Sequence, residues 1–280
     1  MPDVDDRMLV AALVAGDAGG LAGVYDAYAD RLFAYCVALL GERDAAGDAV
    51  HDTLLIARER VAALRDPDKL RPWLYAIARN ECLRALRAGR RIAELDLAAD
   101  VSDETVDPDS GLRATEGHEL VWSALASLNP GEREVLELGL RHELAGAELA
   151  TALGVSVNHA HALSSRARTQ LERAVAALVV ARTGQDDCPE LAGLLTGWDG
   201  GLTPLLRKRI GRHLENCPIC GEQRRRRVSA AALLAGLPFG FAPPALRRRL
   251  VRDAGNVELV ADNVALADRA GPWRTGGFPR

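Results

Sequence analysis

The chain has 280 residues, of which 48% are hydrophobic and 26% are charged, a balance typical of globular proteins with about two or three domains. Its formal net charge of −4 excludes a uniformly basic protein that coats nucleic acid, so contact with nucleic acid must depend on local basic patches or on a partner. Only 4% of the residues are aromatic, which favours a helical protein over an aromatic-rich β-sandwich.

The first part of the chain, residues 5–92, predicts a bundle of helices because its apolar residues recur at steps of three and four. The predicted helices cover residues 6–15, 20–40, 44–64 and 72–88. Glycines at Gly41 and Gly89 are placed to end the second and the fourth of these helices.

The last predicted helix of this bundle carries a basic and polar face. Arginines that recur at helical steps beside an aromatic ring suit single-stranded or melting DNA, with phosphates on the guanidinium groups and a base against the ring. The candidate residues are Trp73, Arg79, Asn80, Arg84 and Arg87. The alternative is a solvated basic face beside a tryptophan of the core.

Residues 93–119 differ in composition from the segments on either side. They hold nine acidic residues and one basic residue, a net charge of −8, and are interrupted by proline and glycine. This composition predicts a linker that is extended by its own charge repulsion.

A second helical region, residues 120–182, contains a candidate helix-turn-helix. Asn129 predicts a helix start, and further on a helix over 147–153, a turn at Gly154 and a second helix over 157–177 follow. In such a motif the second helix enters the major groove of DNA. Its candidate base and phosphate contacts are Asn158, His159, His161, Ser165, Arg166 and Arg168. Helix pairs with a glycine turn also occur in ordinary helical bundles, so packing without DNA binding is the alternative interpretation of this helix pair.

Five cysteines, an odd number, follow an acidic N-terminus without the apolar core of a signal peptide, which indicates a reducing, cytoplasmic compartment. Four residues have the spacing of ligands for one tetrahedral, structural metal ion, predicted to be Zn²⁺: Cys188, His213, Cys217 and Cys220. A thiol redox pair or a coincidental Cys-x-x-Cys is the alternative. Cys36 and Cys82 lie in apolar helical contexts and are expected in the core.

No constellation of catalytic residues is present in the sequence, so an enzyme is not expected. There is no phosphate-binding GxxxxGK[ST], no GxSxG and no HExxH, and the adjacent His51 and Asp52 point to different faces of a helix. The uncharged stretch 228–246 holds three prolines and two glycines, which makes it a poor membrane span, so stable membrane insertion is not expected.

In this order, the parts of the chain resemble an RNA polymerase sigma factor of the extracytoplasmic-function (ECF) type. The segment LRPWLYAIARNECLRALRAGRR resembles part of sigma region 2, and ALASLNPGEREVLELGLRHELAGAELATALGVS resembles part of sigma region 4. Residues 188–227, which contain HLENCPIC, resemble the zinc-binding fold of anti-sigma proteins, here fused to the chain. Residues 228–280 form a tail rich in Gly, Pro and Arg with no assigned role.

The resemblance implies an all-α protein with two helical sigma domains, an acidic linker between them and a small helical zinc-binding domain. It implies that the protein binds core RNA polymerase, at the β′ clamp helices and the β flap, and that it recognises and melts promoter DNA. The residues at the β′ clamp helices would be Asp48, Val50, His51 and Asp52. The candidate residues of the basic helix would lie at the −10 element, and those of the helix-turn-helix at the −35 element.

The C-terminal domain is expected to modulate this activity in cis, by covering region 2 or region 4, to bind a separate anti-sigma or signalling partner, or to sense zinc or thiol oxidation through a redox-sensitive zinc site. Two other functions remain open. The first is a helix-turn-helix regulator that binds DNA without polymerase, against which the acidic net charge argues. The second is an anti-sigma-like adaptor, which is kept open because His159 and His161 stand where the family usually has other recognition residues, cations among them.

Overall fold

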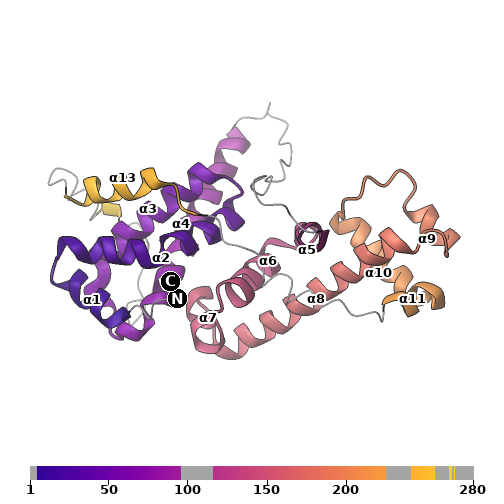
Figure 1. The fold of residues 1–280 in the computed structure, drawn as a ribbon, viewed down its shortest axis with the longest axis horizontal. Helices are drawn as coiled ribbons and strands as arrows, with labels where there is room; N and C mark the ends of the chain where they lie inside the picture. The colour runs from indigo at the N-terminus through magenta and orange to yellow at the C-terminus, as the bar shows by residue number, and fades with distance from the viewer. Residues whose placement is uncertain (1–4, 96–115, 225–240, 256–264, 267, 269–280) are drawn as a thin grey trace. The chain divides into compact units, whose positions relative to one another are not determined.

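The computed structural model describes residues 5–95, 116–224, 241–255, 265–266 and 268 (Figure 1). Every regular element in these residues is helical and none is a strand, which confirms the predicted all-α fold. Most of the predicted acidic linker, residues 96–115, lies outside the described residues, as do residues 228–240 of the uncharged stretch. Within the described residues, no helix is long and apolar enough to span a lipid bilayer.

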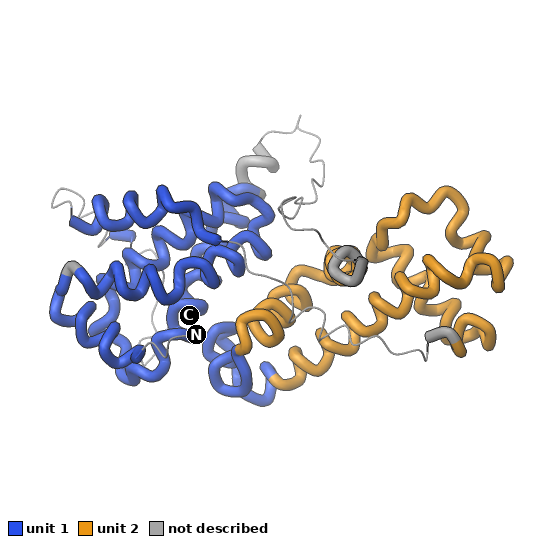
Figure 2. Tube along the Cα trace, in the orientation of Figure 1, with its two compact units in different colours: residues 1–109, 144–160, 239–280 blue, residues 110–143, 161–238 orange. Residues whose placement is uncertain are grey.

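The chain divides into two compact units (Figure 2). Unit 1 consists of residues 1–109, 144–160 and 239–280, and unit 2 consists of residues 110–143 and 161–238. The division places the C-terminal segment in the same unit as the N-terminal helices, although about 200 residues separate them in the sequence.

Unit 1 is built on four N-terminal helices that pack against one another. They are α1 (Asp6–Val14), α2 (Ala18–Leu40), α3 (Arg43–Arg60) and α4 (Leu70–Leu95), with 3₁₀ turns at Val61–Ala63 and Pro67–Lys69. The core between them is aromatic and aliphatic: Trp73, Leu54 and Ile56 have no exposed surface, and the rings of Tyr35 and Tyr75 meet edge to face at 5.5 Å.

Helix starts and ends in unit 1 follow local chemistry. The carboxylate of Asp17 accepts a hydrogen bond from the Gly19 N–H at the start of α2, and Gly41 ends that helix in the left-handed conformation, as predicted. A Cβ on Gly20 would come within 2.8 Å of the α1 backbone, so only glycine permits this approach of the two helices. The expected end of α4 at Gly89 is wrong, because the helix continues to Leu95. One glycine inside a helix costs only about 1 kcal/mol, so a single glycine need not end a helix.

Two further parts belong to unit 1. The first is α7 (Gly146–Leu153) with the first residues of α8 (Val157–Thr183), and the second is α13 (Pro244–Gly255), which packs on α2 and α3. α13 lies in the tail to which the sequence assigns no role.

Unit 2 contains the rest of α8 and several shorter helices. These are α5 (Glu116–Ala126), α6 (Pro130–Leu136), a π-helical turn (Glu137–Arg141), α9 (Pro189–Leu194), α10 (Pro204–Asn216) and α11 (Pro218–Arg224). Asn129 and Glu132 cap α6 reciprocally, so the predicted helix start at Asn129 is confirmed. A buried ion pair between Glu137 and Arg141, at 2.9 Å, fixes the π-helical turn.

Candidate nucleic-acid and polymerase interfaces and metal centre

The four residues expected at the polymerase all lie on α3, but they differ in exposure. Asp48 is exposed and Asp52 is half-buried, whereas Val50 has no exposed surface and His51 is 5% exposed. Asp48 and Asp52 each have an arginine as ion-pair partner inside unit 1, and Nε2 of His51 is 3.1 Å from Oδ2 of Asp253. Val50 therefore acts as a packing residue in this conformation, and the polar residues around it are already occupied.

The basic face of α4 is only partly available to a ligand. Arg87 is exposed, whereas Arg79 and Asn80 are half-buried and have partners of their own. Arg84 donates to Asp52 on α3 at 2.9 Å and also contacts the buried Glu81. The face is therefore cationic but partly neutralised by carboxylates of its own unit.

Trp73 does not lie on this face. Its side chain has no exposed surface and belongs to the core of unit 1. The expectation that a base stacks on this ring is wrong for this conformation, because no face of the ring is open. The structure instead contains the alternative that the sequence allowed, which is a core tryptophan beside a basic face.

The predicted helix-turn-helix is present as a local structure. α7 ends at Gly154 with a φ of 69°, a left-handed conformation that glycine adopts without strain, and the Ser156 hydroxyl accepts a hydrogen bond from the His159 N–H at the start of α8. On α8, Ala160 and Ala167 are buried. All six candidate contact residues are exposed: Asn158, His159, His161, Ser165, Arg166 and Arg168. One side of α8 is thus free to meet a ligand.

The four predicted metal ligands come together in unit 2. Cys188 precedes α9, His213 lies in the last turn of α10, and Cys217 and Cys220 flank the start of α11. The four ligand atoms all lie within 4.8 Å of one another. Nε2 of His213 is 3.4 Å from Sγ of Cys188 and 3.3 Å from Sγ of Cys220, and the Sγ atoms of Cys188 and Cys217 are 4.0 Å apart.

These distances fit a metal ion. Ligand atoms that lie about 2.0–2.3 Å from a tetrahedral ion are about 3.5–3.8 Å from each other, close to the separations found between these side chains. The other ring nitrogen of His213, Nδ1, is 3.5 Å from Oε2 of Glu190, the arrangement that commonly orients a metal-bound histidine. The cluster can therefore hold one metal ion with four protein ligands and no open position.

The thiols of the cluster differ in acidity. The backbone N–H of Cys220 is the main cause that lowers the pKa of Cys217, because it stabilises the thiolate. Burial and the neighbouring thiols raise the pKa of Cys220 to about 12. A cation bound between the ligands is what would draw the proton from Cys220 at neutral pH. Cys36 and Cys82, by contrast, are fully buried in unit 1 as predicted.

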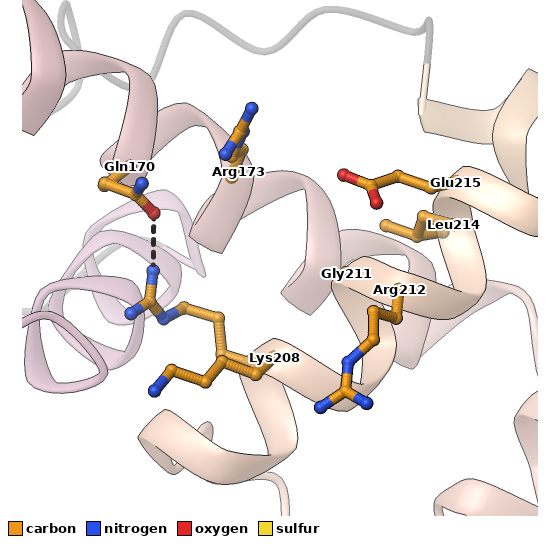
Figure 3. Close-up of a pocket in the computed structure, with 8 residues that line it drawn as sticks. Gln170, Arg173, Lys208, Gly211, Arg212, Leu214 and Glu215 are labelled. Atoms are coloured by element: carbon orange, nitrogen blue, oxygen red, sulfur yellow. Dashed lines mark hydrogen bonds between the residues drawn. The ribbon is translucent and has the colours of Figure 1, made fainter.

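A basic cleft of about 250 Å³ lies between α8 and α10 in unit 2 (Figure 3). The Arg207 guanidinium donates to Oε1 of Gln170 across it at 2.9 Å. The lining residues are Gln170, Arg173, Arg207, Lys208, Gly211, Arg212, Leu214 and Glu215. The Arg207–Gln170 hydrogen bond links the helix that carries His213 to α8.

One set of contacts, which α13 makes with α2 and α3, was not expected from the sequence. Arg247 forms a bidentate ion pair with Asp26, Arg249 pairs with Asp48, and Asp253 pairs with His51. A pattern of Leu246 and Leu250 among arginines predicts an amphipathic helix there, but it does not predict what covers its apolar side.

Comparison with known proteins gives the family. Residues 24–92 match the Sigma-70 region 2 family. The ECF RNA polymerase sigma factor SigG of Mycobacterium tuberculosis is 31% identical over 192 residues, which cover 60% of this chain and 52% of SigG. The RNA polymerase sigma factor CnrH of Cupriavidus metallidurans is 30% identical over 187 residues, 61% of this chain and 94% of CnrH.

SigL, another ECF RNA polymerase sigma factor of Mycobacterium tuberculosis, is 28% identical over 151 residues, 52% of this chain and 84% of SigL. The chain thus spans about half the length of SigG and most of the length of SigL and CnrH. It belongs to the ECF-type family of RNA polymerase sigma factors.

Proposed function

We propose that this protein binds core RNA polymerase and directs it to recognise and melt a set of promoters. The observation that carries the proposal is the match of residues 24–92 to Sigma-70 region 2. That segment includes α3 with its four candidate polymerase contacts and most of α4 with its basic face. Such a protein acts in the cytoplasm, beside the polymerase, and is not an enzyme.

In this proposal, α4 holds the −10 element after the strands separate. Unstacking a base costs a few kcal/mol, which a cationic face and a pocket for the base can offset. Arg87 is exposed and can meet a phosphate directly, and Arg84 reaches the DNA only by sharing or leaving Asp52. Trp73 supports α4 from inside the core and does not contact DNA.

The exposed side of α8 would read the −35 element. Asn158 and the two histidines stand at the N-terminal end of the helix, where a recognition helix contacts base edges, and Arg166 and Arg168 follow at positions suited to phosphates. An imidazole offers ring nitrogens for hydrogen bonds but, unlike a guanidinium group, carries no permanent charge. Base recognition by this protein therefore relies less on fixed positive charge than on hydrogen bonding.

The Cys188, His213, Cys217 and Cys220 cluster would hold a structural zinc ion. Three thiolates and one imidazole form the closed, tetrahedral ligand set that zinc prefers in structural sites. When bound, the ion would cross-link α9, α10 and α11, because its four ligands lie in these helices or directly before them. These helices and the segment after them would modulate the sigma factor in cis, or meet a separate anti-sigma or signalling partner.

Reconstituted transcription tests the proposal. Purified core polymerase with genomic fragments should give transcripts with discrete 5′ ends only when this protein is added, and these start sites should share −10 and −35 sequences. Arg166→Ala should weaken initiation. The matched control is Arg182→Ala, which removes an exposed arginine from the other end of the same helix. Tight binding of duplex promoter DNA without polymerase, and no discrete starts with it, would contradict the proposal.

A further inference from the structure

The contact between α13 and the α2–α3 face is organised by charge. Three carboxylates of α2 and α3 point to the C-terminal segment: Asp26, Asp30 and Asp48. Arg247 donates two hydrogen bonds to Asp26, at 2.8 and 3.0 Å, and the backbone N–H of Ala242 donates to Asp30 at 2.8 Å. Arg249 donates to Asp48. Each of these three acidic residues, which we call the acidic face, is thus matched by a donor from residues 242–249.

The centre of the contact is apolar and desolvated. Leu246 and Leu250 stand four residues apart, on one side of α13, and are 5% and 0% exposed. Burying two leucines against α2 and α3 contributes about 2 kcal/mol each before the entropy of fixing the helix is counted. Buried apolar side chains within a frame of ion pairs are typical of a specific interface rather than of an incidental surface contact.

The far end of α13 is held by α3. Oδ2 of Asp253 is 3.1 Å from Nε2 of the buried His51, and the Arg58 guanidinium donates to the Ala254 carbonyl at 2.6 Å. A cation at the last carbonyls of a helix satisfies acceptors that have no partner within the helix and favours its dipole. The orientation and the register of α13 on this face are therefore both specified.

α13 contacts some of the residues that are proposed to bind the polymerase. Asp48 and His51 are two of the four candidate polymerase contacts on α3, and both are paired with α13. A polymerase element cannot use these side chains while α13 does. α13 is a basic, amphipathic helix, which is the kind of ligand that the acidic face would also bind from another molecule.

We propose that α13 is an intramolecular ligand of the α2–α3 face and that its docking excludes core RNA polymerase from region 2. This inference rests on the proposed function, because it assigns regulation to the same surface. It differs from control by the metal-binding segment, since the covering element is a helix of the C-terminal tail. A helix docked in about nine of ten molecules would weaken the apparent affinity for polymerase about tenfold.

The decisive variants reverse one charge at a time in the full chain. Arg247→Glu places two carboxylates side by side at Asp26 and should release α13. The matched control is Arg248→Glu, the same charge change at an exposed neighbour that has no ion-pair partner among the residues the structure describes. Asp26→Arg combined with Arg247→Glu restores an ion pair with the signs exchanged and should dock α13 again.

Two readouts separate the docking from its consequence. Hydrogen exchange should lose protection over residues 244–255 in Arg247→Glu and regain it in the double variant. Core polymerase should bind Arg247→Glu about tenfold more tightly than the wild type, with Arg248→Glu and the double variant close to wild type. Leu250→Asp, which places a charge in the buried centre of the contact, should release α13 in the same way.

Each contrary result has a distinct meaning. If α13 is released and the affinity for polymerase is unchanged, the inference is overturned and the sigma-factor function stands. If no variant binds polymerase, the proposed function fails, although hydrogen exchange still reports the docking. If neither Arg247→Glu nor Leu250→Asp lowers protection, or if protection rises with protein concentration because the helix comes from a second copy, the intramolecular contact is overturned.

Discussion

Arg84 on α4 donates a hydrogen bond to Asp52 on α3 at 2.9 Å, and so joins a candidate DNA contact to a candidate polymerase contact. The same guanidinium contacts Glu81, which is only 2% exposed. The structure thereby links the two surfaces that the proposed function uses. A polymerase element that drew Asp52 away would leave Arg84 freer to meet a phosphate.

This pair predicts a difference between two arginines of one helix. Arg84→Ala removes an ion-pair partner of the buried Glu81 and should lower the free energy of unfolding by about 1–2 kcal/mol. Arg87→Ala removes an exposed arginine and should change stability by less than about 0.5 kcal/mol, while both variants impair promoter melting. Denaturant unfolding and permanganate reactivity of the promoter measure the two effects. Equal stability of the two variants would contradict the assigned role of Arg84.

The α13 contact predicts a change in the titration of Asp26. The hydrogen bonds from Arg247 lower the pKa of Asp26 below its usual value of 3.8. A carboxyl group with a lowered pKa favours docking above its undocked pKa, and this contribution is lost as the pH falls through the lowered value. Arg247→Gln should return the pKa of Asp26 towards 3.8, as measured by carbon NMR, and Arg248→Gln should leave it unchanged. No response to Arg247→Gln would show that the pair is absent in solution.

The apolar centre of the same contact predicts a local loss of stability. Leu250→Ala deletes a side chain with no exposed surface, a loss of about 2–4 kcal/mol that exceeds the docking free energy of a helix docked in about nine of ten molecules, so α13 should be released. Val251→Ala, at a neighbour that is 49% exposed, should have an effect below about 0.5 kcal/mol. Hydrogen exchange at residues 244–255 measures both, and equal effects would place Leu250 outside any interface.

The Cys/His cluster predicts one bound metal ion per chain. Cys220→Ser should abolish stoichiometric zinc binding and lower the melting temperature of unit 2, and a chelator should have the same effect on the wild type. Glu190→Gln should keep the ion but weaken its affinity by up to about tenfold, because Glu190 lies beside His213 and is itself exposed. Affinity should fall as the pH is lowered, since protons compete for the ligands. Elemental analysis that finds no metal in protein expressed with zinc would contradict the assignment.

Local signals in the sequence predicted much of the fold. Gly41, Asn129 and Gly154 each mark a helix end or turn by chemistry that acts within a few residues, and the structure confirms all three. The spacing of His213, Cys217 and Cys220 also predicted that these side chains meet, because the three residues lie close together in the sequence, at the end of one helix and the start of the next. Gly89 is misleading as a stop signal, since α4 continues past it and one glycine inside a helix costs only about 1 kcal/mol.

Contacts between distant parts of the chain could not be predicted in this way. The sequence marks Trp73 as an aromatic ring beside arginines, but only the packed bundle shows that the ring faces inwards. Likewise, an amphipathic helix at 244–255 can be expected from Leu246 and Leu250, whereas its partner is set by carboxylates about 200 residues earlier. The burial of Trp73 and the docking of α13 both depend on which helix faces pack together. The periodicity of apolar residues does not identify the partner of a helix face.

Competition for core RNA polymerase is the sharpest test of whether this chain is a polymerase specificity subunit. Labelled full-length protein with Arg247→Glu, in which the proposed covering helix is released, is mixed with core polymerase and titrated with an unrelated sigma factor of known affinity. We expect saturable binding of one chain per polymerase, and we expect the other sigma factor to displace it completely. Absence of binding, or binding that the other sigma factor does not displace, would contradict the assignment of this chain as a polymerase specificity subunit.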